Sequence, residues 1–186
     1  MARLSDKIEL VEIDYMTSSV KAMFLRDYAT LPTPGGIISV RRGEEVDLPR
    51  WQALMLASKG IVDIKDEKLD LDRINMYHFR EVKRSAANQL AELPRDFYLK
   101  VRDLISMLNE VIKTNPSHMV FREREVVETN VTQLAEKRLT KIIRLAQAGG
   151  GDMRDKLTTE EAILYNEMSR AIEEWRSFIR SLFPLG

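Results

Sequence analysis

The sequence has no cysteine and only two histidines in 186 residues. Without cysteine, the chain has no disulfide, thiolate zinc site, iron–sulfur cluster or cysteine nucleophile. His78 and His118 lie far apart and outside any HExxH-type pair, so we interpret both as surface or packing residues. We therefore expect neither a metal nor another cofactor.

The sequence also lacks a long apolar run and an excess of charge of one sign. The start of the chain interrupts its apolar residues with Asp6, Lys7 and Glu9, which excludes an export signal there, and no later run reaches bilayer length. We expect no membrane partner and a cytosolic protein, or a nuclear one in a eukaryote. The 29 basic and 29 acidic residues balance, which argues against binding to nucleic acid through bulk charge.

The first third of the chain predicts a small β-containing domain. Residues 8–13 set extended-type side chains among charges, and the β-branched run 37–40 is typical of a strand. Residues 41–45 predict a hairpin turn with Gly43 at its bend.

A short helix and a further strand complete this domain. Pro49 suits the first turn of a helix over residues 51–58, Gly60 suits its left-handed stop, and residues 61–64 predict a strand. We expect the apolar residues of the helix to stabilise the domain: Trp51, Leu54 and Leu56.

Beyond residue 66 the apolar spacing becomes helical. One amphipathic set comprises Leu71, Ile74, Tyr77 and Val82. Pro94 is expected to open the next helix, whose apolar residues recur every three or four positions and predict a buried stripe: Phe97, Val101, Leu104, Leu108 and Val111.

The last part of the chain predicts two more helices. A break at residues 115–117 precedes a long helix over 120–146, and residues 149–152 read as a flexible link. Thr158 and Glu161 match a capping box, and the final helix ends before Pro184. The fold class is therefore α+β, with a small β-rich domain over residues 1–66, a helical domain over 67–186, and a hinge at 65–69.

No catalytic motif emerges. The glycines at 149–151 follow a helix and lack the Gly-Lys-Ser/Thr of a phosphate-binding loop, so the linker interpretation is preferred. Neighbouring carboxylates such as Glu160 and Glu161 point in different directions on a helix. An acid–base pair remote in sequence would leave no trace in one sequence. We expect a protein that is not an enzyme.

Basic residues gather in two places. On the long helix lie Lys137, Arg138, Lys141 and Arg144. This cluster could contact phosphate or pair with glutamates of a neighbouring helix or partner, and we favour the pairing because no aromatic residues interleave with it. A second patch near the predicted hairpin and short helix offers DNA or partner contacts: Arg41, Arg42 and Arg50.

Several apolar and aromatic residues are candidates for interfaces. Trp175 on the last helix is either core or a subunit anchor, since tryptophan is enriched at binding hot spots. The long helix carries more apolar surface than one stripe needs, which suits contact with both its own core and a partner: Leu134, Leu139, Ile142 and Ile143.

Three segments in fixed order carry a resemblance to a known family. The first comprises Leu48-Pro-Arg-Trp-Gln-Ala53 and Gly60-Ile-Val-Asp-Ile64, the second is Leu93-Pro-Arg-Asp-Phe-Tyr98, and the third is Glu136-Lys-Arg-Leu-Thr-Lys-Ile142. Together they resemble the GINS family of replication proteins. Members of that family combine a helical A domain with a small β-rich B domain. The order and compact length here resemble the archaeal B-then-A subunit class, the Psf-two/Psf-three branch.

The resemblance implies a scaffold rather than an enzyme. It implies assembly with the other GINS subunit type into a four-chain complex that activates the replicative helicase. The implied partners are the MCM ring, a RecJ/Cdc-type protein, and primase or polymerase, with weak or indirect DNA contact. We expect Tyr98 to bind across helices through its hydroxyl. Two other hypotheses are a stand-alone nucleic-acid-binding module, which zero net charge disfavours, and an enzyme with an unrecognised site.

Overall fold

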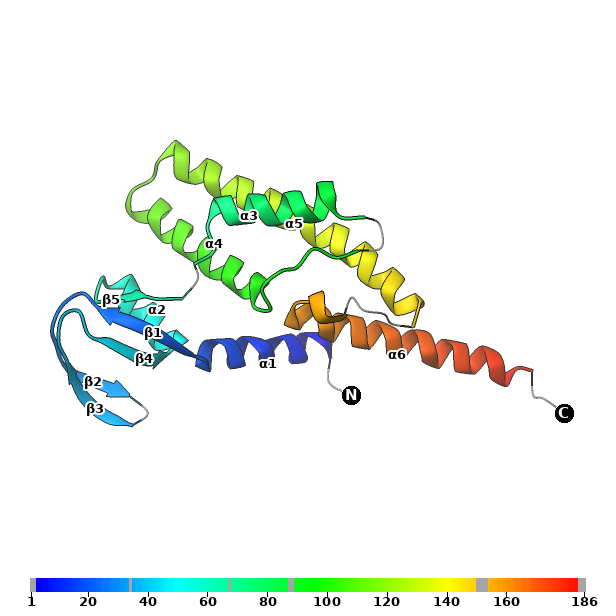
Figure 1. Cartoon of the computed structure of the whole chain (residues 1–186), viewed down its shortest axis with the longest axis horizontal. Coiled ribbons are helices and arrows are strands. Elements are labelled where there is room, and N and C mark those ends of the chain that lie inside the picture. Colours follow the sequence, from blue (N-terminus) through cyan, green and yellow to red (C-terminus); the bar gives the residue numbers. More distant parts are fainter. Residues whose placement is uncertain (1–2, 34, 67, 87–88, 150–153, 184–186) are drawn as a thin grey trace. The chain divides into compact units, whose positions relative to one another are not determined.

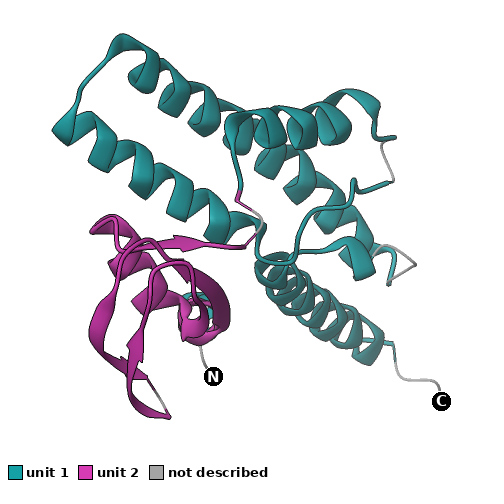
Figure 2. Ribbon diagram, turned by 60° about the vertical axis from the view of Figure 1, so that its left-hand side comes forward, with its two compact units in different colours: residues 1–8, 69–186 teal, residues 9–68 magenta. Residues whose placement is uncertain are grey.

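The protein has an α+β fold, with a small β region followed by a larger helical region (Figure 1). The computed structural model describes residues 3–33, 35–66, 68–86, 89–149 and 154–183. The chain divides into two compact units (Figure 2). We call residues 9–68 the small unit, and residues 1–8 with 69–186 the helical unit. The expected domains, 1–66 and 67–186, differ from these units because the first eight residues group with the helices.

The N-terminal segment is a helix, α1 (Leu4–Thr17), and the expectation of extended structure over residues 8–13 is wrong. Ile8, Val11 and Tyr15 are spaced by three and four positions, which places them on one side of a helix, and Tyr15 is buried. The helical period therefore outweighs the strand propensity of the β-branched residues.

The small unit contains a three-stranded antiparallel sheet in the order β4-β1-β5. Its strands are β1 (Ser19–Phe24), β4 (Glu45–Pro49) and β5 (Val62–Ile64). Alternate residues of β1 are buried, namely Val20, Ala22 and Phe24, as expected for a strand with one face on the core. The predicted strand at residues 61–64 is confirmed as β5.

A separate two-stranded sheet joins β2 (Tyr28–Thr33) to β3 (Gly36–Val40), which confirms the strand predicted at residues 37–40. The turn at Gly43 is present, with a left-handed φ of 88°. The hairpin expected around it is wrong, because β3 pairs with β2 while β4 pairs with β1. The turn connects two sheets rather than two paired strands.

The short helix α2 (Arg50–Ser58) follows β4 directly, with Pro49 as its N-cap. Gly60 has a φ of 64°, which confirms the predicted left-handed stop. Ala53 and Leu56 are buried, whereas Trp51, which was expected to stabilise the domain, is 48% exposed and lies outside its core. Trp51 lies two positions before Ala53, and this offset turns its side chain to the opposite side of the helix.

The helical unit begins with α3 (Leu71–His78), which continues as one turn of π-helix, η1 (Phe79–Arg84). The next helix is α4 (Phe97–Thr114), which starts three residues after Pro94. Its predicted stripe is buried except for Val111, which is 37% exposed near the end of the helix. The core of this part is formed by Ile74, Tyr77, Leu93, Phe97, Val101, Leu104, Leu108, Val127 and Leu134.

The long helix α5 (His118–Gln147) and the final helix α6 (Thr159–Ser181) agree with the predicted elements. A 3-10 turn, η2 (Arg154–Lys156), precedes α6. The capping box of Thr158 and Glu161 is confirmed in both directions. Gly149 has a φ of 81°, and the rest of the predicted link at 149–152 lies outside the described residues.

A second apolar cluster joins α5 to α6. It contains Leu90, Ile142, Leu145, Ala146, Leu157 and Tyr165. Towards its C-terminal end, α6 extends away from α3, α4 and α5 (Figure 1). Among the described residues, no helix combines the length and the apolar character that a membrane crossing requires.

Candidate functional site

The most distinctive feature of the helical unit is a cluster of four buried charged side chains. Arg138 and Lys141 come from α5, Glu81 from η1 and Glu161 from α6. None of the four is more than 5% exposed. Charges this deeply buried occur when they are paired, and here two cations face two carboxylates.

Arg138 is the centre of this ion cluster. Its Nε and Nη2 atoms donate to the two oxygens of Glu161 at 2.6 and 2.7 Å, and Nη1 donates to Glu81 at 2.9 Å. The backbone carbonyls of Ala91 and Lys156 accept further bonds at 2.8 and 2.9 Å. The guanidinium therefore satisfies all three of its nitrogens and joins η1, α5 and α6.

Lys141, one turn further along α5, holds the other side of Glu81. Its ammonium group pairs with the Glu81 carboxylate and also donates to Ser85 at 2.9 Å and to the carbonyl of Gln89 at 2.7 Å. Glu81 in turn accepts from the backbone N–H of Ala91 at 2.8 Å. These bonds fasten the chain that follows η1 to α5.

The Glu161 carboxylate accepts hydrogen bonds from three residues. Its carboxylate accepts from the Tyr98 hydroxyl at 2.8 Å, from Arg138, and from the backbone N–H of Thr158 at 3.0 Å. The expected bond of Tyr98 across helices is therefore present, and it reaches from α4 to α6. Phe97 packs edge-on against both Tyr77 and Tyr98, at 5.6 and 5.2 Å between ring centroids, which fixes the position of the phenol.

The Arg138 guanidinium stays charged in its buried position. Burial opposes the charged form of Arg138, but the hydrogen bonds and charges of Glu161 and Glu81 outweigh burial and raise the pKa of the guanidinium. Burial and the neighbouring Glu161 carboxylate raise the pKa of the Tyr98 phenol. Both carboxylates are occupied by cations inside the protein, so the arrangement is suited to holding helices together rather than to proton transfer with a substrate.

A groove of about 260 Å³ adjoins the ion cluster through Tyr98 and Glu161. Its wall is mostly apolar: Leu4, Ile8, Ala135, Leu139, Ile142 and Leu164. Glu136 and Glu160 also line it, and neither oxygen of Glu160 has a hydrogen-bond partner among the described residues. Burial raises the pKa of the Glu160 carboxyl. The volume is below the range usual for small-molecule sites.

The structure separates the predicted basic cluster into two pairs. Arg138 and Lys141 are buried in ion pairs, as the pairing interpretation expected, whereas Lys137 and Arg144 are exposed on α5. Arg41 and Arg42 are exposed in the turn between β3 and β4.

The position of Arg50 does not agree with its predicted role as a DNA or partner contact. It is buried, pairs with Asp66 at 2.7 Å, and lies 4.2 Å from the centre of the Tyr15 ring. These contacts keep its charge inside the small unit.

The apolar residues predicted as interface candidates occupy both core and surface positions. Val101, Leu104, Leu134 and Ile142 are core residues, Leu54 is half-buried, and Leu139 lines the groove. Trp175 is 62% exposed, which excludes the core alternative for this residue.

Sequence reasoning missed Glu81 and the role of Glu161. Glu161 stands out in the sequence only as part of the capping box, and Glu81 has no local signal, because its partners lie 57 and 60 positions away.

The two histidines lie apart, with His78 bonded to Gln133 at 2.8 Å. Among the described residues, no group of three or more His, Asp or Glu side chains is arranged to hold a metal ion.

No protein-family model matches the chain, and no curated protein is significantly similar to it in sequence.

Proposed function

We propose that this protein is a non-catalytic subunit of a GINS-type scaffold, acting in the cytosol at replication forks with the MCM ring and a RecJ/Cdc-type partner. In this function the chain binds other proteins through its helical unit and leaves ATP hydrolysis to the helicase. The three sequence segments that resemble the family are one support. The surface of α6 is the other.

The observation that carries the proposal is an uncovered apolar surface on the second half of α6. Trp175 and Phe178 are 62% and 53% exposed, and their rings lie 5.6 Å apart. Leu182 and Phe183 continue the surface, also more than half exposed. Exposed aromatic and aliphatic side chains grouped in this way are typical of a protein–protein interface, and an exposed tryptophan among them is typical of a hot spot.

The ion cluster supports the same function. It ties η1, α4, α5 and α6 together through buried pairs, and its side chains are closed to solvent. A scaffold needs helices held at fixed positions, whereas an active site needs groups that a substrate can reach.

The test is native mass by light scattering. The chain would be measured alone and mixed with an A-then-B GINS subunit from the same organism. We expect a stable four-chain complex. A chain that remains a monomer and ignores that subunit would overturn the proposal.

A matched pair of variants would locate the interface. Trp175→Ala with Phe178→Ala removes the paired aromatic rings of the α6 surface and is expected to lower the affinity of assembly at least tenfold. Phe121→Ala, at a side chain that is 51% exposed on α5, is the control and should assemble like wild type. Equal losses in both would place the interface elsewhere.

The alternative, a stand-alone nucleic-acid-binding module, is favoured by one observation, a group of exposed cations around η1.

A further inference from the structure

Five exposed cations surround the outer side of the ion cluster, and we call this group the basic surface. It consists of Arg80, Lys83 and Arg84 of η1 with Lys137 and Arg144 of α5. None of the five forms an ion pair with a carboxylate among the residues that the structure describes. Many other surface cations of the protein do have such partners, for example Lys7 with Glu167 and Lys113 with Glu110.

The packing of η1 on α5 brings the five cations together. Gln133, Lys137, Lys141 and Arg144 follow one another at helical spacing and so share one side of α5. Within this row, Gln133 bonds to His78, and Lys141 bonds to Glu81 and Ser85. That side of α5 therefore lies against the α3–η1 segment, and the exposed Lys137 and Arg144 border η1.

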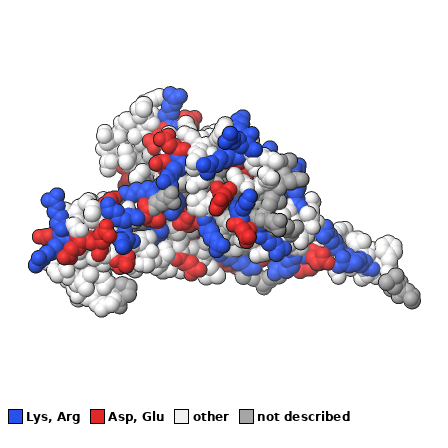
Figure 3. Space-filling model, viewed as in Figure 1, with Lys and Arg blue, Asp and Glu red and all other residues white. Residues whose placement is uncertain are grey.

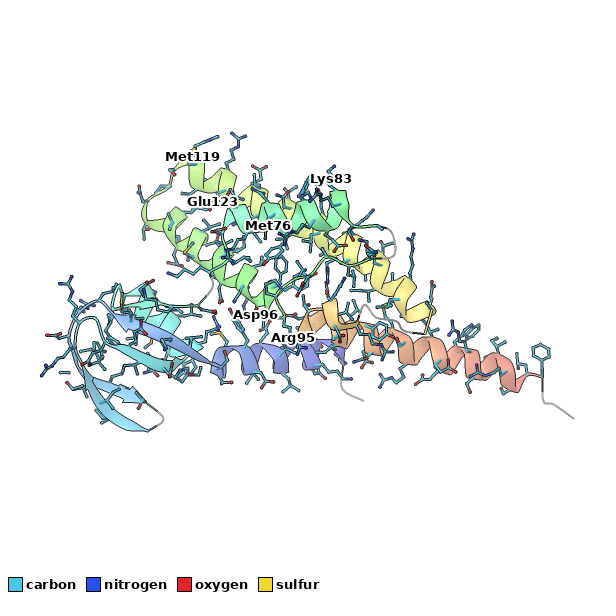
Figure 4. The ribbon with its side chains drawn as sticks, viewed as in Figure 1. Met76, Lys83, Arg95, Asp96, Met119 and Glu123 are labelled. Atoms are coloured by element: carbon cyan, nitrogen blue, oxygen red, sulfur yellow. The ribbon has the colours of Figure 1, made fainter. Side chains whose placement is uncertain are left out.

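The same packing removes negative charge from this surface. Glu81 is the one carboxylate of η1, and it is fully buried against Arg138 and Lys141. Residues 137–147 of α5 contain no Asp or Glu. Lys and Arg side chains gather over the η1 end of α3 in Figure 3, and Lys83 is labelled there in Figure 4. A chain without net charge thus has a locally positive surface.

An aromatic ring lies within the basic surface. Phe79 is 51% exposed, and the Arg84 guanidinium lies 5.9 Å from its ring centre. Phe79 follows directly after His78, whose ring contacts Gln133 of α5. An exposed aromatic ring among cations is the combination on which proteins stack unpaired bases while neutralising the phosphates beside them.

We propose that the basic surface and Phe79 bind single-stranded nucleic acid. The cations neutralise successive phosphates, and one base stacks on the Phe79 ring. This contact goes beyond the scaffold function and does not depend on assembly with other chains. An acidic protein segment would use the cations but has no base to place on the ring, so the exposed phenyl group favours nucleic acid.

The experiment is fluorescence anisotropy of a labelled dT20 strand titrated with the full-length chain at 50–200 mM salt. Neutralising five phosphates predicts a slope of log K against log salt of about −3.5 for a single strand. We expect weaker binding to a 20-base-pair duplex, because paired bases cannot stack on Phe79. A labelled rU20 strand distinguishes RNA from DNA as the preferred ligand.

Two variants test the cations and the ring of the basic surface separately, and a third variant is the control. Lys83→Glu, Arg84→Glu and Lys137→Glu combined should weaken dT20 binding at least tenfold and flatten the salt slope. The control combines Arg41→Glu, Arg42→Glu and Lys59→Glu, three exposed positions of the small unit with the same change in net charge, and should bind within twofold of wild type. Phe79→Ala should weaken binding about tenfold with an unchanged salt slope. Circular dichroism melts confirm that each variant is folded, and the corresponding glutamine variant replaces any that is not.

Three results would overturn the proposal. The first is no binding of either strand at 50 mM salt. The second is an equal loss in the charge variant and its control, which would show bulk attraction. The third is a Phe79→Ala protein that binds dT20 like wild type while an acidic peptide competes as well as the strand, which would identify the surface as a protein-binding one.

Discussion

Glu161 combines a helix cap with two contacts between helices. Its oxygens accept from the Thr158 backbone at the start of α6, from Tyr98 of α4 and from Arg138 of α5. The capping bond satisfies an N–H that the helix itself leaves free, while the other two bonds satisfy buried donors. One carboxylate therefore couples the start of α6 to the positions of two other helices.

Removal of the second carboxylate tests the ion cluster at the scale of one residue. Glu81→Gln leaves Arg138 and Lys141 buried with an uncompensated charge, so we expect the free energy of unfolding to fall by about 3–5 kcal/mol in urea titrations. Glu92→Gln, at an exposed position nearby in the sequence, should change it by less than about 0.5 kcal/mol. A Glu81→Gln protein as stable as wild type would mean that the pairs contribute no stability.

Glu160 gives the protein a dependence of stability on pH. Because burial raises the pKa of its carboxyl in the folded state, the folded chain holds this proton more tightly than the unfolded chain. The stability that the proton contributes is present below the unfolded-state pKa, about 4.3, and is lost as pH rises through the folded-state value.

Replacing Glu160 by glutamine, which does not ionise, should remove the loss of stability at high pH. We expect Glu160→Gln to be more stable than wild type at about pH 7.5 and equal to it near pH 3.5, measured by thermal melts across the range. Glu136→Gln, an exposed acid that lines the same groove, is the control and should follow wild type at both pH values. A difference for Glu160→Gln that stayed constant with pH would assign the effect to packing instead.

At the scale of elements, α4 shows how a stripe of apolar residues divides into core and surface. Phe97 is fully buried between two tyrosine rings, whereas Val111 at the other end is 37% exposed. We expect Phe97→Ala to lower the free energy of unfolding by about 3–5 kcal/mol and Val111→Ala by less than about 1 kcal/mol. Chemical denaturation of both variants checks this, and a Phe97→Ala protein that unfolds like wild type would remove Phe97 from the core.

The single π-helical turn after α3 decides which residues of η1 face α5. It presents Glu81 to Arg138 and Lys141 while the three basic residues of η1 remain exposed. Single turns of this kind occur often at functional positions. The basic surface exists because of this local geometry, since the acid that would offset it is turned inward.

At the scale of the whole molecule, the two units have separate apolar cores. Phe24, Leu31 and Leu48 are fully buried in the small unit, and Phe97 and Leu134 in the helical unit. Units with their own cores open independently when one core is weakened.

Hydrogen exchange tests this independence. Leu48→Ala should speed exchange of backbone amides in β1, β4 and β5 at least tenfold while amides of α3–α6 keep their wild-type rates. Phe97→Ala is the reciprocal variant and should speed exchange in the helical unit alone. A uniform increase in both units from either substitution would show that the chain unfolds as one cooperative body.

The sequence alone determined the class of fold and the long helices. Periods of three and four residues, the Thr158 cap and the Gly60 stop are local signals, and local signals are read without knowing the rest of the chain. Where two local signals conflicted, as in α1 with its β-branched residues, reading the propensity led to the wrong element.

Tertiary structure alone decided which charges are internal and which face solvent. In the sequence Lys137, Arg138, Lys141 and Arg144 are one cluster, and no aromatic residue stands near them. Packing of η1 brings Glu81 and Phe79 to this cluster from more than fifty positions away, burying Arg138 and Lys141 and leaving the other two exposed. Pairing at that distance depends on where the helices cross, and no local pattern of residues encodes the crossing.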